Sequence, residues 1–486
     1  MRTLILSSLS ILGGLTTVHA QHWVPYGFYA FKENPKKAEV QEQAPLVMEQ
    51  QPVIVEGTES EAIIADFAEF ESDLMSFEDP NSKYYADPDL TYGSKNVQKQ
   101  PKTKAPKKVK ECSARRCVEN WWIEGDYLFV WMKKGDIRTP LITTGELTDP
   151  IPGAYGQPNT HVVFGNQHYN YHRKSGVKGS IGGFIGTEGE FAFDVDGFWV
   201  FTTEKHFSIA SDAAGNPLIA RPFFDVSTGM ENAQIVSKPG FYSDRSTALM
   251  KTQFWGGEVN FGYRPCKNTN WGDLSLGFRY LHLREKLRIR DKITPFTTPS
   301  GLTFNGSTNP LTAVNPPDTL KDEDEFRTTN NFYGGQVGIR AEFANCWASF
   351  DIYGKVAFGA TEEKYKTDGE TIWNSSTFGP QYASGGVLVQ PNNMAHRKRW
   401  KFAYVPEVGV DLGLQPCDHI RVLVGYSFLW WSKVLRPGDQ IDRDVNSGQI
   451  PTNTAYYTPA SQLPSEHLHD KPFWMQTINF GIMFDF

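Results

Sequence analysis

The sequence predicts an all-β fold, an antiparallel up-and-down β-barrel that crosses a membrane with about ten strands, or with about twelve if a long loop holds a further hairpin. Three observations carry this prediction. After residue 117, segments of about ten residues alternate apolar and polar side chains, which is the pattern of a strand with two different faces. The connections between these segments alternate between short and long. Aromatic residues reach 14% and glycine numbers 43, a composition typical of strands and turns.

The first 20 residues predict a cleavable secretory signal peptide. Arg2 supplies a positive start, an apolar core runs from Leu4 to Leu15, and Ala20 ends a small-residue cleavage site. This core is shorter than the roughly 20 apolar residues that a membrane-spanning helix needs, and no other segment reaches that length. An exported chain of this kind is either a soluble secreted protein or a barrel in the bacterial outer membrane, and the alternation favours the barrel.

Residues 21–117 predict a disordered, low-complexity periplasmic extension that acts as a linker. The stretch begins aromatic, becomes rich in Gln and Glu, and ends with a basic run from Lys95 to Lys110, with few periodic apolar residues. We interpret the basic run as a solvated tether, and contact with anionic lipid or a cell-wall polymer is the alternative. The formal net charge of −7 argues against a nucleic-acid partner, which needs a basic surface.

The barrel is expected over residues 118–486, with each strand near the roughly 9–11 residues that cross a bilayer. The alternating segments are Trp121–Met132, Val177–Gly186, Glu190–Phe201, Trp255–Arg264, Asp273–Leu281, Tyr333–Phe343, Ala348–Gly359, Lys401–Leu414, Ile420–Trp431 and Phe473–Phe486. One face of these strands is expected to meet lipid, and it carries Phe191, Val195, Trp199, Phe261, Leu276, Phe278, Val422 and Val424. Because unpaired backbone groups are costly in hydrocarbon, we expect the sheet to close on itself.

Short and long connections alternate as in a bacterial outer-membrane barrel, which has tight periplasmic turns and long outer loops. The tight turns are TEGE, CKNTN, ANC and QPCDH, and the long connections lie near residues 133–176, 202–250, 290–330, 361–399 and 434–472. Aromatic residues are expected at both strand ends, where the membrane meets water. The predicted outer girdle consists of Trp131, Trp199, Trp255, Trp400, Trp430 and Trp474, and the inner girdle of Trp121, Trp122, Tyr263 and Trp271.

The face opposite the lipid is expected to line the lumen, and it is rich in charge. The predicted charged network consists of Glu124, Asp126, Glu190, Asp194, Asp196, Glu258, Arg264, Asp273, Arg279, Arg340, Asp351, Lys355, Glu407, Asp411 and Arg421. A direct register across each tight turn predicts facing pairs, which are Arg264 with Asp273, Glu258 with Arg279, Arg340 with Asp351, Gln336 with Lys355, and Asp411 with Arg421.

Three interpretations of this charged lumen are open. A salt-bridge network that fills a narrow lumen is preferred, because a barrel of about eight strands leaves room only for side chains. A restricted pore, biased by its charges, comes next. An active site built from Glu190, Asp194 and Asp196, or from outer-loop histidines, is least favoured, since no nucleophile–base signature such as GxSxG occurs. We expect no enzymatic activity, no metal site and no cofactor.

The cysteines precede the first strand or lie in tight turns, and they are Cys112, Cys117, Cys266, Cys346 and Cys417. The predicted topology places all of them on the periplasmic side, where disulfides persist. Because their number is odd, at least one is unpaired or bonded to another chain. The two alternatives are disulfides that staple turns within the barrel and disulfides that cross-link it to other envelope proteins.

The chain ends in NFGIMFDF, where Phe480, Ile482, Phe484 and Phe486 occupy alternate positions. We expect this segment to be the last strand and to close the barrel against the first. An aromatic last residue with apolar residues at alternate positions upstream resembles the recognition signal of the outer-membrane assembly machinery, which is therefore an expected partner.

Several stretches in chain order carry a family resemblance, and they are GDYLFVWMKKG, LSLGFRYLHLRE, NNFYGGQVGIRAE, VPEVGVDLG, GYSFLWWSKVLRPGDQIDR and FWMQTINFGIMFDF. Over residues 120–486 the chain resembles the beta-barrel porin seven family, outer-membrane proteins of planctomycetes and their relatives. The resemblance implies an outer-membrane barrel of the porin kind, with no catalytic residues to carry over. It also implies that cysteines near these turns are common.

The expected function is that of a porin-like outer-membrane barrel, which allows passive diffusion of small solutes through a narrow charged lumen, supports the cell envelope, or does both. The alternatives are a closed structural barrel cross-linked by periplasmic disulfides, an outer-membrane enzyme and a surface adhesin. The expected partners are outer-membrane lipid and lipopolysaccharide, together with the assembly machinery.

Overall fold

The computed structural model describes residues 121–169, 173–185, 190–264, 272–305, 313–344, 347–417, 419–454, 456, 462–466 and 468–486. The predicted signal peptide and periplasmic extension lie outside the described residues, as do Cys112, Cys117, Cys266, Cys346 and Trp271. Within the described ranges, no helix is both long enough and apolar enough to cross a membrane.

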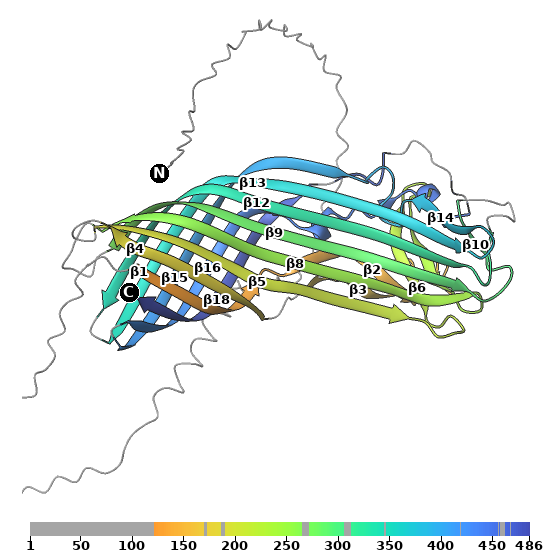
Figure 1. The fold of residues 1–486 in the computed structure, drawn as a ribbon. Helices are drawn as coiled ribbons and strands as arrows, with labels where there is room; N and C mark the ends of the chain where they lie inside the picture. The colour runs from red at the N-terminus through yellow and green to blue at the C-terminus, as the bar shows by residue number, and fades with distance from the viewer. Residues whose placement is uncertain are drawn as a thin grey trace, which may run out of the picture. The chain divides into compact units, whose positions relative to one another are not determined.

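The main body of the described chain is a closed antiparallel barrel of ten strands (Figure 1). Its strands are β1 (Trp121–Met132), β4 (Lys174–Ile185), β5 (Phe191–Ala210), β8 (Tyr242–Tyr263), β9 (Gly272–Pro295), β12 (Thr319–Ala344), β13 (Ala348–Ser375), β15 (His396–Cys417), β16 (Ile420–Leu435) and β18 (Asp470–Asp485). Each strand pairs with the next barrel strand along the chain, and β1 pairs with β18 to close the ring. The predicted up-and-down barrel of ten strands is therefore confirmed.

The last strand is held at its very end. The N–H of Phe486 donates to the carbonyl oxygen of Trp121 at 2.9 Å, and the N–H of Trp121 donates back to Phe486 at 2.9 Å. Phe480 pairs with Tyr127 and Phe484 with Ile123 across the β1–β18 seam. The prediction that the terminal stripe closes the barrel against the first strand is confirmed.

The lipid-facing prediction agrees with the exposure of the side chains. The eight residues predicted on this face are between 37% and 66% exposed. Trp122 was predicted in the inner girdle and lies instead inside the barrel, where its ring centroid is 5.3 Å from that of Phe184. Its neighbours Trp121 and Ile123 are exposed on the outside, and adjacent residues of a strand cannot share a face.

Six barrel strands are much longer than predicted and have 20 to 28 residues each. They continue past the part of the barrel whose outward side chains are apolar, which we call the membrane belt. The side-chain pattern reverses along them. In the first part of β9, Leu276 and Phe278 are exposed on the outside, whereas farther along Arg284 is exposed and Leu283 and Leu287 are buried inside. The regions near 202–250, 290–330 and 361–399, predicted as loops because of their charge, are therefore largely strand.

The remaining elements lie at the long-loop end of the barrel (Figure 1). A second sheet contains β2 (Gly135–Gly145), β3 (His161–Tyr169), β6 (Leu218–Asp225), β7 (Met230–Ser237) and β17 (Asp444–Val445). The shorter elements are the paired strands β10 (Leu302–Thr303) and β11 (Ala313–Val314), strand β14 (Gly379–Ser384) on β13, and the 3-10 helices η2 (Pro437–Gln440) and η3 (Ser447–Gln449).

The second sheet packs against the inward faces of the extended barrel strands in one buried cluster. Ile142 of β2 and Phe223 of β6 belong to this cluster together with Leu287 and Ile289 of β9. We call this cluster, with the sheet that it buries, the extension core. Burial of these apolar side chains accounts for the reversed pattern, because here the inside of the barrel is apolar and the outside meets water.

A buried arginine ties the second sheet to the barrel wall. The Arg221 guanidinium of β6 lies 2.7 Å from the carboxylate of Asp291 in β9 and 2.8 Å from that of Asp324 in β12. Its Nε donates to the carbonyl oxygen of Leu141 at 2.8 Å. Removal of one partner of such a buried ion pair leaves an uncompensated charge, so this contact specifies how the sheet docks.

Candidate functional site

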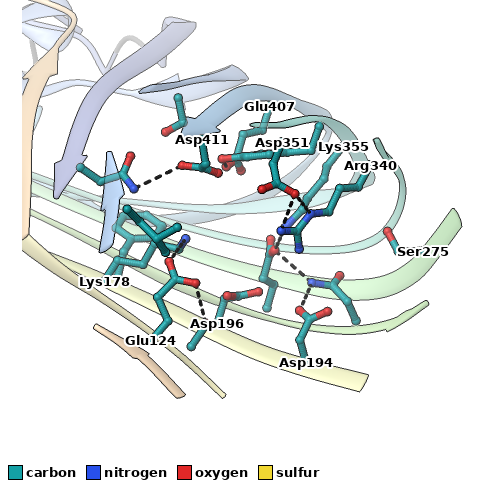
Figure 2. A pocket seen from close by; sticks show the side chains of 18 of the residues that line it. Glu124, Lys178, Asp194, Asp196, Ser275, Arg340, Asp351, Lys355, Glu407 and Asp411 are labelled. Atoms are coloured by element: carbon teal, nitrogen blue, oxygen red, sulfur yellow. Dashed lines mark hydrogen bonds and ion pairs between the residues drawn. The ribbon is translucent and has the colours of Figure 1, made fainter. Parts of the chain in front are cut away.

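A charged cavity of about 370 Å³ occupies the inside of the barrel at the short-turn end (Figure 2). Its lining comes from all ten barrel strands, because each strand turns every second residue inward. Arg264, Asp273 and Asp485, which lie at the short-turn ends of their strands, line it and bring it to the rim.

The structure brings most of the predicted charged network together around this cavity. Glu124, Asp194, Asp196, Glu258, Arg264, Asp273, Arg279, Arg340, Asp351, Lys355, Glu407, Asp411 and Arg421 line it. Asp126 is buried beside it and accepts a hydrogen bond from Asn479 at 3.2 Å. Glu190 lies just before β5, where its carbonyl oxygen accepts from the N–H of Arg264 at 2.8 Å.

Two of the predicted facing pairs form as expected. Arg264 and Asp273 make a double contact, with Nε–Oδ1 at 2.7 Å and Nη2–Oδ2 at 2.9 Å. Glu258 lies directly opposite Arg279, whose Nε donates to it at 2.8 Å. These contacts confirm the direct register across the turn between β8 and β9.

The other three predicted pairs do not face each other, so the predicted registers of two hairpins are wrong. The residues found opposite Arg340, Gln336 and Asp411 are Tyr353, Ala357 and Gly425, respectively. Each error is an even number of residues, which leaves every side chain on its predicted face and only slides the partners. At the QPCDH turn the chain reverses between Cys417 and Ile420, later than predicted, and the bulge between Leu414 and Cys417 changes the register by only one residue. Arg340 still reaches Asp351 diagonally at 2.9 Å.

Glu258 is the centre of the ion-pair network in the cavity. Arg279 and Lys355 both contact its carboxylate, and Asn260 donates to it at 3.0 Å. Arg279 also lies 2.7 Å from Glu407. The network therefore links β8, β9, β13 and β15, so it ties together a large part of the barrel wall from inside.

Sequence reasoning missed several members of this network. Lys178 lies 3.5 Å from Glu124 and 3.8 Å from Asp126, and Glu342 lies 3.8 Å from both Arg264 and Arg421. Lys178 and Glu342 each stand at an inward position of an alternating segment, which was the available signal. Asn260 and Asn479 were missed because neutral amides carry no charge to mark them.

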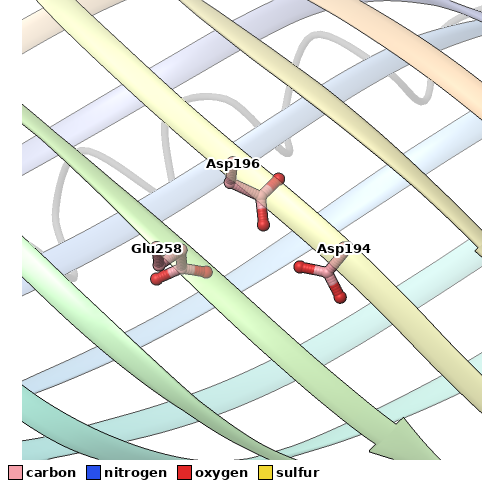
Figure 3. Close-up of side chains that lie close together, drawn as sticks. All are labelled: Asp194, Asp196 and Glu258. Atoms are coloured by element: carbon pink, nitrogen blue, oxygen red, sulfur yellow. The ribbon is translucent and has the colours of Figure 1, made fainter. Parts of the chain in front are cut away.

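Three carboxylates in the cavity lie close enough together to share a cation (Figure 3). Oxygen atoms of Asp194, Asp196 and Glu258 lie within 4.8 Å of one another. Carboxylate oxygens are suitable ligands for Mg²⁺ or Ca²⁺. However, Arg279 and Lys355 already bring positive charge to Glu258, so the protein itself offsets the repulsion between these groups.

An apolar layer ends the cavity on the side away from the short turns. This layer consists of Leu128, Val130, Met132, Val200, Phe254, Leu281, Leu283, Phe332, Ala357, Ala403, Val405, Leu429, Trp431, Val434, Phe473 and Met475. Its members come from every barrel strand except β4, and none is more than 5% exposed.

Aromatic rings in the apolar layer meet across the lumen. The ring centroid of Phe254 in β8 lies 6.5 Å from that of Trp431 in β16 and 5.2 Å from that of Phe473 in β18. In the ring of barrel strands, β8 and β16 are on opposite walls, with four strands between them on each side. At this level side chains fill the inside of the barrel.

Comparisons with known proteins bear on the class of this barrel. The family model described as "Putative beta barrel porin-7 (BBP7)" matches residues 122–486. No curated protein matches the chain.

Solved structures with a similar arrangement are remote. The outer membrane protease OmpT from Escherichia coli aligns with a TM-score of 0.30 and 8% identity, covering 76% of this chain and 96% of that one. A FadL homologue from Pseudomonas aeruginosa aligns at 0.21 and 9%, covering 75% and 90%. The toluene transporter TodX from P. putida aligns at 0.20 and 9%, covering 76% and 89%.

Proposed function

The chain belongs to the beta barrel porin-7 family, and on that premise we propose that it is an outer-membrane barrel with a closed lumen and a structural role in the cell envelope. The apolar layer is the observation that carries this proposal. A diffusion channel needs a continuous water-filled path, whereas Phe254 contacts rings from the opposite wall here.

The charged cavity supports the same proposal. Its arginines and lysines contact carboxylates from other strands, as Arg279 does with Glu258 and Glu407. Such cross-strand contacts hold the wall together from inside. In this proposal the network serves as internal bracing, and the apolar layer separates it from the extension core.

Planar-bilayer recording of the refolded full-length protein tests the closed lumen. We expect the wild type to give no discrete conductance steps. The double variant F254A/F473A removes two rings that meet across the lumen, so it should produce steps.

The matched control is F261A, which removes a lipid-facing ring from the same strand β8 and should stay silent. Heat-modifiable migration on gels checks that each variant still forms a barrel. Frequent steps from the wild type would contradict the closed lumen.

A second candidate is narrow, charge-biased diffusion of small solutes, as the family's name implies. The observation that favours it is the reach of the cavity to the rim beside Arg264, Asp273 and Asp485. In this alternative, part of the apolar layer moves to open the path. Wild-type conductance that depends on solute charge would favour this candidate.

We propose no catalytic role for the cavity. The carboxylates of Glu258, Asp273 and Asp351 are in contact with arginine or lysine side chains, so they are poorly placed to accept a proton from a substrate. A hydrolase or protease assay in which activity disappears on replacing Asp273 or Asp351 would overturn this part of the proposal.

Export, assembly and cross-linking complete the proposal. We infer that residues 1–20 are a signal peptide removed on export, and that the terminal aromatic stripe is recognised by the assembly machinery. Cys417 is exposed at the end of β15 and forms no disulfide within the described part of the chain, which supports contact with another envelope protein through a disulfide. Non-reducing electrophoresis that shows only monomer would contradict such cross-links.

A further inference from the structure

A continuous aromatic band marks the outside of the barrel at the end of the membrane belt. Ring centroids of Trp199, Trp255, Tyr280, Tyr333 and Trp400 follow one another at 6.1, 5.2, 5.1 and 5.9 Å. The band crosses β5, β8, β9, β12 and β15. Aromatic rings of this kind lie at the level of lipid headgroups.

Two rows of cations lie directly beyond this band on the same outer face. The first row runs Gln253, Arg284, Thr329, Lys364 and Lys398, each residue opposite the next across neighbouring strands. It begins two residues along each strand from the row of Trp255 and Trp400, which is a distance of about 7 Å.

The second row lies two residues farther along the same strands. It runs Lys251, Lys286, Arg327, Lys366 and His396, again with each residue opposite the next. We call the cations of both rows the collar, which consists of Arg284, Lys364, Lys398, Lys251, Lys286, Arg327 and Lys366.

The collar places like charges face to face. Lys251 lies opposite Lys286, Lys286 opposite Arg327, Arg327 opposite Lys366, and in the first row Lys364 opposite Lys398. Like charges directly opposite one another destabilise a sheet. Nearby negative charge must offset this repulsion if the arrangement is to be stable.

Carboxylates of the protein offset only part of the charge. Those in contact with the seven collar cations are Glu204, Glu325, Glu362 and Asp368. Glu325 is shared with Arg288, which lies outside the collar. The side chain of Arg284 is exposed, and it makes no hydrogen bond or ion pair with any residue in the described part of the chain.

We propose that the collar binds the phosphate groups of anionic lipid headgroups in the membrane that surrounds the barrel. The first row lies two residues beyond the aromatic band on β8 and β15 and four residues beyond it on β9 and β12. The collar therefore follows the band across several strands, as expected for contact with a lipid layer rather than with a compact protein partner. Arginine and lysine are the side chains that recognise phosphate. The inference rests on the proposed membrane location.

Lipid selectivity in reconstituted bilayers tests the collar. The full-length protein is reconstituted in phosphatidylcholine, and quenching of its tryptophan fluorescence by brominated phosphatidic acid is compared with quenching by brominated phosphatidylcholine. For the wild type, we expect phosphatidic acid to be preferred by at least about fivefold, the factor that one cation near an anionic surface contributes. The preference should fall several-fold in R284Q/K364Q/K398Q, which leaves only the second row, and should weaken in high salt.

The matched control is R245Q/R290Q/K292Q, which removes the same charge from outward positions farther from the band on β8 and β9. It should keep the wild-type preference. A second variant, R284K, keeps the charge and should also keep the preference.

Two outcomes would overturn the collar. One is equal quenching by both lipids in the wild type, and the other is an equal loss of preference in the collar variant and the matched control. Flotation with vesicles and heat-modifiable migration report insertion separately. Failure of the wild type to insert would therefore count against the membrane location itself, whereas insertion without lipid preference would count against the collar alone.

Discussion

At the scale of single residues, Arg436 is a buried cation that holds several parts of the protein wall together. Its Nε lies 2.7 Å and its Nη2 2.6 Å from oxygens of Glu285, and its Nη1 donates to the carbonyl oxygens of Lys133 and Lys134 at 3.1 and 2.7 Å. The arginine thus joins the end of β16 to β9 and to the connection after β1, between the apolar layer and the extension core.

Arg436 to Ala should lower the free energy of unfolding by about 3–5 kcal/mol, because it leaves the Glu285 carboxylate buried without its cation. Urea unfolding in detergent, followed by tryptophan fluorescence, measures the change. The double variant E285L/R436M should recover most of the loss. A loss below about 1 kcal/mol in R436A would contradict this account of the pair.

Asp322 makes the extension core sensitive to pH. Burial raises the pKa of the Asp322 carboxyl well above its ordinary value, and the nearby carboxylates of Asp324 and Asp291 raise it further. The folded state therefore binds this proton more tightly than the unfolded state does. The stabilisation is complete below the unfolded pKa of about 3.9 and is lost as pH rises through the higher folded pKa.

Asp322 to Asn should reduce the fall in unfolding free energy that the wild type shows as pH rises from about 4 toward neutrality. Asn keeps an oxygen that can accept the 3.2 Å hydrogen bond from Thr371. Urea titrations at several pH values measure the slope. The exposed Glu370 gives the control E370Q, which should keep the wild-type slope, and an unchanged slope in D322N would disprove the assignment.

At the scale of elements, the sequence allowed the ten strands and their faces to be predicted. Apolar and polar side chains alternate at every second residue of a strand, and an error in one connection does not change this alternation in the next strand. Strand length was not predictable in the same way. Beyond Leu281, β9 still alternates, but its inward side chains are apolar and its outward side chains are charged. Because outward apolar residues were used to identify the strands, the segment with Arg284 and Lys286 was interpreted as a loop. The second sheet was missed in part because its strand β6 is buried on both faces and shows no alternation.

The candidate site shows the same limits. Inward charged residues were identified because they alternate, along each strand, with lipid-facing Phe and Val residues. Their partners depend on turn geometry, and the β8–β9 hairpin follows the direct register while the hairpins after β12 and β15 do not. The contact between Lys355 and Glu258 joins strands that are not neighbours, so no hairpin argument could have found it.

The strand β18 carries a prediction about assembly. Removal of Phe486 deletes the last hydrogen-bonded pair with Trp121 and the terminal aromatic ring. We expect the amount of heat-modifiable barrel in cell membranes to fall several-fold, whereas the same variant refolded in detergent should migrate like the wild type. F486Y, which keeps an aromatic end, is the control. Equal losses in cells and in detergent would indicate a purely structural role.

At the scale of the whole molecule, the inside of the barrel consists of three levels. The charged cavity lies at the short-turn end, the apolar layer follows, and the extension core fills the long-loop end. Of the three levels, only the charged cavity is polar enough to be filled by water. The closed lumen therefore depends on the middle level, where F254A/F473A should have its effect, and the other two levels should withstand that change.

The reversal of polarity along the long strands also determines how deeply the barrel sits in its bilayer. A shift of two residues in one direction would bring Arg284 and Lys364 toward hydrocarbon, and a shift in the other would expose Leu274 and its neighbours to water. Each cation costs about 2–4 kcal/mol at the bilayer midplane and much less near its edge. The order of apolar and charged side chains along the outside of the sheet therefore fixes the depth of the barrel in the bilayer. A bilayer that is thinner or thicker than this apolar surface must deform around the barrel.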